Sequence, residues 1–161
     1  MKLFYKIIDR TTRTGIFIAS LTLLGIMAII MANVLYRISG GIIPGTYDLV
    51  ELMIIVVVGF SMAYTALKRT HISAKLLVDR FSERNKAIID GITSLIGSGF
   101  WMLVAIVSVR LTMEKAGLGE KTELLGISFI PFRWIWVFTL ILFGTVLAIN
   151  GIKSIREALK K

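Results

Sequence analysis

Cysteine is absent from the 161-residue chain, and histidine occurs only once, as His71. Without cysteine, the chain cannot form a disulfide, an iron–sulfur cluster, a thiolate zinc site or a thiol nucleophile. A single histidine also excludes bis-histidine haem ligation, and the sequence around it contains no Ser–His–Asp arrangement or glycine-rich phosphate loop. We therefore expect that the protein is not an enzyme and that it binds no cofactor and no metal ion.

Proline is nearly as scarce, with only Pro44 and Pro131, and both lie at the edges of long apolar runs. Because proline breaks helix interiors, this distribution favours long uninterrupted helices. Charged residues make up only 18% of the chain, whereas hydrophobic residues make up 56% and the mean hydropathy is +0.82. Water-soluble domains are about 45–50% apolar, so the composition indicates a membrane protein.

Four segments are long and apolar enough to cross a bilayer core, which takes about 20 helical residues. The predicted spans cover residues 15–35, 47–67, 87–109 and 134–152. We interpret the first as a retained helix, because cleaved signal peptides have apolar regions of about 7–15 residues and a cleavage site that is missing here. The fold class is therefore all-α, with residues 1–161 forming a single four-helix transmembrane domain.

Lysine and arginine are spread unevenly along the chain, and in membrane proteins they favour the cytoplasmic side. Fourteen of the 19 basic residues lie in the two termini and in the loop between the second and third spans. We therefore expect both termini and this loop to be cytoplasmic. Contact with anionic membrane lipids accounts for the net charge of +9, so we expect no nucleic-acid partner.

The stretch after the second span, ALKRTHISAKLLVDRF, has apolar residues at steps of four and five, as on one face of a helix. It predicts an amphipathic surface helix over about residues 71–81. The alternative is that the second span extends into the cytoplasm and then turns. Lys68 and Arg69 would lie at the lipid headgroups, and His71 would bond to the backbone or to Asp79.

Aromatic and small residues predict further contacts. Trp134 and Trp136 lie at the expected outer end of the fourth span, where tryptophan commonly anchors a helix at the interface. The third span carries small residues at helical spacing, among them Gly91 and Ser98, and such residues let helices approach closely. The loop after it predicts a short surface helix around residues 111–116.

The second span has two acidic residues near its start, Asp48 and Glu51, one turn apart. Ionisable groups in a span are candidates for function, because charge is costly in lipid. Three interpretations stand: a solvated pair favoured by the positive end of the helix dipole, a bond to a partner protein, or ion transport by Glu51. The middle of every span lacks acidic and basic residues, which argues against a free-standing pump or exchanger.

The chain resembles the small membrane subunit (Q subunit, DctQ-like) of tripartite ATP-independent periplasmic (TRAP) transporters. The resemblance extends over nearly the whole chain and is carried by short motifs. They are GFSMAYTALKRTHISAKLLVDRF with His71 and Asp79, YDLVELM with Glu51, and LLGIS at residues 124–128. A tryptophan that often precedes the acidic pair in the family is absent here.

The resemblance implies a scaffold subunit in the bacterial inner membrane. A large membrane subunit would carry the substrate and sodium sites and move like an elevator. A periplasmic substrate-binding protein would deliver an organic acid to this complex. Two alternatives stand beside it: a self-contained homo-oligomeric exporter or proton-coupled transporter that uses Glu51, and a membrane adaptor without transport activity.

Overall fold

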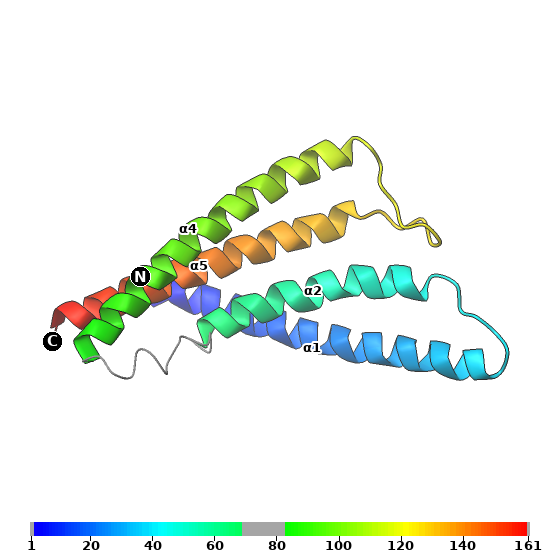
Figure 1. The fold of residues 1–161 in the computed structure, drawn as a ribbon, viewed down its shortest axis with the longest axis horizontal. Coiled ribbons are helices and arrows are strands. Elements are labelled where there is room, and N and C mark those ends of the chain that lie inside the picture. The colour runs from blue at the N-terminus through cyan, green and yellow to red at the C-terminus, as the bar shows by residue number, and fades with distance from the viewer. Residues whose placement is uncertain (1, 69–82, 161) are drawn as a thin grey trace.

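The computed structural model describes residues 2–68 and 83–160, which form four long helices (Figure 1). The helices are α1 (Lys2–Ile38), α2 (Thr46–Leu67), α4 (Glu83–Ala116) and α5 (Ile130–Lys160). All four are long and apolar enough to cross a membrane, and the described residues contain no strand. The all-α membrane fold predicted from the sequence is thereby confirmed. The predicted surface helix at residues 71–81, with Arg69, His71 and Asp79, lies outside the described residues.

The fourth helix, α5, is the centre of the bundle. It packs mainly against α4 and α2, with a smaller contact to α1. In the most apolar 18-residue stretch of α5, 50% of the residues are buried, compared with 11% in the corresponding stretch of α4. The two chain ends lie at the same end of the molecule, and the α1–α2 pair and the α4–α5 pair diverge toward the other end (Figure 1). We call this other end the distal end.

The helices are longer than the predicted spans. The first helix begins at Lys2, and its early turns are held by Ile8 and Thr12, which are buried against the bundle. Charges limit which residues can cross the lipid, but they do not prevent a helix from continuing beyond it. For the same reason, the prediction of a separate surface helix at residues 111–116 is wrong, because these residues are the end of α4.

The third predicted span has the helix-packing face that its small residues indicated. A Cβ atom on Gly151 of α5 would lie 3.0 Å from the carbonyl oxygen of Gly91, so the two backbones are close together. About two turns further along, Ser98 donates a buried hydrogen bond of 2.8 Å to the carbonyl oxygen of Gly144. This prediction is therefore confirmed for the α4–α5 pair.

Further polar and aromatic contacts fix α5 to α2 and α4. The side-chain amide of Asn150 donates a buried 2.7 Å hydrogen bond to the carbonyl oxygen of Ala66. This carbonyl belongs to the last turn of α2, where carbonyl groups lack a partner within the helix. Trp101 of α4 packs edge-to-face on Phe143, with ring centroids 5.3 Å apart. Direct contacts between side chains and backbone thus join α5 to both α2 and α4.

Candidate functional site

The connection between α4 and α5 folds back on itself at the distal end, in a segment that we call the distal hairpin (residues 120–129). The amide of Phe129 donates to the carbonyl oxygen of Glu120 at 3.3 Å, and that of Thr122 donates to the carbonyl oxygen of Ile127 at 2.9 Å. The buried Thr122 hydroxyl in turn accepts a 3.1 Å hydrogen bond from the Ile127 amide. These bonds give the hairpin a defined shape without a long strand.

Asp48 holds this hairpin against the start of α2. Its Oδ2 atom accepts hydrogen bonds from the backbone amides of Leu124 and Leu125, both at 2.9 Å. Only 7% of Asp48 is exposed. Gly45, just before α2, has a φ of +78°, and a Cβ there would clash with the Leu125 side chain. The acidic start of α2 and the LLGIS motif therefore meet in space, although they lie far apart in the sequence.

Glu51 lies one turn after Asp48 but has different surroundings. Its side chain is exposed and lines a cleft of about 570 Å³ between α2, α4 and the start of α5. We call this the distal cleft, and its walls include Glu51, Ile54, Val58, Leu111, Arg133 and Trp136. The two acids are therefore not equivalent: one holds a loop within the chain, and the other faces open space.

An ionic bridge spans the distal ends of α4 and α5. Glu120 binds the ammonium group of Lys115 and the guanidinium group of Arg133, each at 2.6 Å. The hydrogen bond from Lys115, together with the positive charges of both partners, lowers the pKa of the Glu120 carboxyl group below its ordinary value. All three side chains are about a third exposed, so the bridge orients these groups more than it stabilises the fold.

The remaining predicted site residues lie apart from one another. Lys68 follows the end of α2, with its ammonium group 5.8 Å from the centre of the Tyr64 ring. Trp134 and Trp136 are both near the start of α5 but face different spaces. Trp134 lines an apolar groove with Phe60 and other residues of α1, α2 and α5, whereas Trp136 lines the distal cleft. Their role as interfacial anchors stays a prediction.

The four apolar helices and the polar contacts at their ends define a multi-pass α-helical membrane protein. The family model of the DctQ component of tripartite ATP-independent periplasmic transporters matches residues 26–161. The chain therefore belongs to this family of small TRAP transporter components, which is a family of transport proteins. Comparison with curated proteins and with solved structures gives no match.

Proposed function

We propose that this chain is the scaffold subunit of a sodium-coupled TRAP transporter that imports an organic acid. In this proposal a large elevator-type membrane subunit carries the sodium and substrate sites, and a periplasmic substrate-binding protein delivers the substrate. The small subunit widens the stationary part of the complex against which the transport domain moves. Membership of the DctQ family supports a role within such a complex.

The observation that carries the proposal is the absence of acidic and basic residues from the middle of the helices. Residues 14–36, 52–67, 91–109 and 134–152 contain none. Two buried polar groups within these stretches, Ser98 and Asn150, make hydrogen bonds between helices. Transported ions and substrates normally need a polar cluster near mid-membrane. A chain that uses its inner polar groups for packing is better suited to support a partner that has such a cluster.

The outer faces of the bundle also suit a membrane subunit with a large partner. α1 and α4 expose many large apolar side chains, which lipid tails or partner helices can cover. We further propose that the protein lies in the bacterial inner membrane with both termini in the cytoplasm, as the basic residues indicate. The distal hairpin would then face the periplasm, where the binding protein arrives.

Reconstitution in liposomes tests this function. The large subunit, the soluble binding protein and a sodium gradient would be supplied with and without this chain, and uptake of the organic acid would be measured. We expect transport only when all three proteins are present. Uptake at full rate by the large subunit and binding protein alone would refute the scaffold role.

The exposed Glu51 favours a second candidate, a self-contained homo-oligomeric exporter or proton-coupled transporter. Its carboxylate lines the distal cleft, which could admit a cation. Glu51 itself lies near the distal end of α2 and not at its middle, which makes this function the weaker candidate. Transport by liposomes containing this chain alone, lost in Glu51→Gln while the oligomer stays intact, would establish it.

A further inference from the structure

We propose that the distal cleft is a contact surface for the large membrane subunit, and that a lysine or arginine side chain of that subunit pairs with Glu51. The inference rests on the proposed function and adds to it a defined surface and the chemistry of the group that binds there. It also assigns one of the three interpretations that the sequence left open for the acidic pair.

The first argument is that Glu51 has no partner among the residues that the structure describes. Two acids near it are occupied: Asp48 binds two backbone amides, and Glu120, which also lines the cleft, binds two cations. Arg133, the basic residue in the cleft lining, is directed at Glu120, and so is Lys115. Of the two acids that line the cleft, Glu51 is therefore the one whose carboxylate is still available.

The second argument concerns the surroundings of this carboxylate. Along α2, Ile54 and Val58 follow Glu51 on the same side of the helix, and both are exposed large apolar residues. Leu111 of α4 faces them across the cleft. A charged group on an apolar wall in a membrane is costly unless an opposite charge compensates it. A basic side chain from a partner helix supplies that charge.

The third argument is the shape of the site, which favours a protein over a lipid headgroup. The α1–α2 and α4–α5 pairs diverge toward the distal end (Figure 1), and the cleft lies between them. Aliphatic side chains on both walls suit the side chains of a packed helix, and Glu51, the acid in this lining that has no partner among the described residues, fixes the register of that helix. Charge complementarity of this kind specifies which partner binds and in what position.

Site-specific cross-linking tests the surface. A photoreactive benzoylphenylalanine would replace Val58, on the cleft wall, or Leu24, an exposed residue of α1 that serves as the matched control. In membranes that contain both subunits, we expect position 58 to cross-link to the large subunit much more strongly than position 24. Cross-links from position 58 to lipid alone, in a complex that is otherwise intact, would overturn the proposal.

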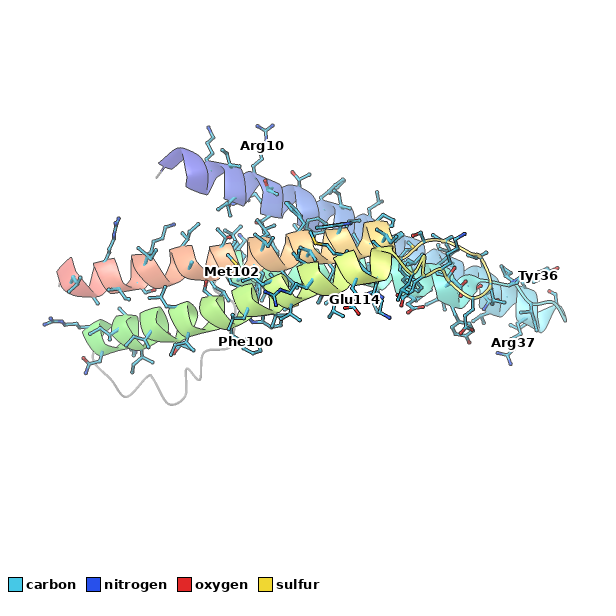
Figure 2. All side chains as sticks on the ribbon, turned by 90° about the horizontal axis from the view of Figure 1, so that it is seen from above. Arg10, Tyr36, Arg37, Phe100, Met102 and Glu114 are labelled. Atoms are coloured by element: carbon cyan, nitrogen blue, oxygen red, sulfur yellow. The ribbon has the colours of Figure 1, made fainter. Side chains whose placement is uncertain are left out.

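Charge reversal tests the ion pair. We expect Glu51→Lys to weaken recovery of the complex by about tenfold or more, as loss of a buried interfacial pair does. Glu114→Lys is the control, because Glu114 is also an exposed acid near the distal end of α4 (Figure 2) but does not line the cleft. If the lysine or arginine of the large subunit that pairs with Glu51 is changed to glutamate, binding to the Glu51→Lys variant should be restored.

The outcomes separate this inference from the proposed function. If the unaltered chain does not bind the large subunit, the proposed function fails. If the complex forms equally well with Glu51→Lys, the function stands and the ion pair is refuted. If Glu51→Gln changes only the lipid that copurifies with an intact complex, the cleft binds a lipid headgroup and the proposal is again refuted.

Discussion

Replacing Asp48 with alanine should release the distal hairpin from α2. The substitution removes the acceptor of two hydrogen bonds, which leaves the amides of Leu124 and Leu125 without their partner. Hydrogen bonds to charged groups contribute about 1.5–3 kcal/mol each. The freed amides can regain part of this from water, because Leu124 and Leu125 are themselves exposed. We therefore expect the free energy of hairpin opening to fall by about 2–4 kcal/mol.

Hydrogen exchange measured by mass spectrometry, in detergent or nanodiscs, gives the local opening energy directly. A fall of about 2–4 kcal/mol should speed exchange in the peptide around residues 120–129 by roughly 30- to 1000-fold. Peptides from the middle of α4 and α5 should exchange as before. Asp48→Asn keeps one carbonyl oxygen as an acceptor, so its effect should be smaller and in the same direction.

Glu51→Ala is the matched control for this experiment. It removes an acid one turn away that has no partner among the described residues, and exposed substitutions of this kind usually change stability by about 0.5 kcal/mol or less. Equal exchange in the Asp48→Ala and Glu51→Ala variants would refute the reasoning, because Asp48 would then contribute nothing to holding the hairpin.

Three further predictions test the packing and the ionic bridge. Gly151→Ala places a methyl group 3.0 Å from a carbonyl oxygen of α4 and should lower stability by about 1–3 kcal/mol in thermal unfolding, whereas Gly99→Ala, with nothing within 4 Å, should not. Asn150→Ala removes the buried bond to α2 and should cost about 1–3 kcal/mol, and Asn33→Ala, whose bond is long and exposed, should cost less. Because the folded-state pKa of Glu120 is lowered, its bridge contributes above the ordinary pKa of 4.5 and is lost as the pH falls through the folded value. Exchange protection of the hairpin should therefore decrease in acid less in Glu120→Gln than in the unaltered chain.

The number and type of the helices could be predicted from the sequence, because length and apolar composition decide both. The helix ends could not. At the start of α1, Lys2 and Lys6 precede the predicted span, yet the helix includes them, and Ile8 and Thr12 in the following turns are buried against the bundle. A hydropathy pattern indicates whether a residue is surrounded by lipid or by water, but it does not indicate where a helix begins or ends.

The candidate site could be predicted only in part. The sequence singled out Asp48 and Glu51, and helical spacing places them on neighbouring positions of one side of α2. The two acids differ in their surroundings because Asp48 binds the distal hairpin, which is 76 residues away from it along the chain. No local pattern carries that information. The ionic bridge at Glu120 was missed, and the one available signal was the mixture of acidic and basic residues in this loop.

The bond that holds the hairpin has a consequence for sequence variation. Asp48 recognises two main-chain amides, and every residue except proline has such an amide. The side chains at these positions, Leu124 and Leu125, are exposed by 65% and 42%. The identity of residue 124 can therefore change without loosening the attachment to α2, whereas the Leu125 side chain also lies against Gly45. The exposed side chain at the tip of the hairpin can therefore vary to suit a different binding surface, while the backbone attachment and the helix bundle stay the same.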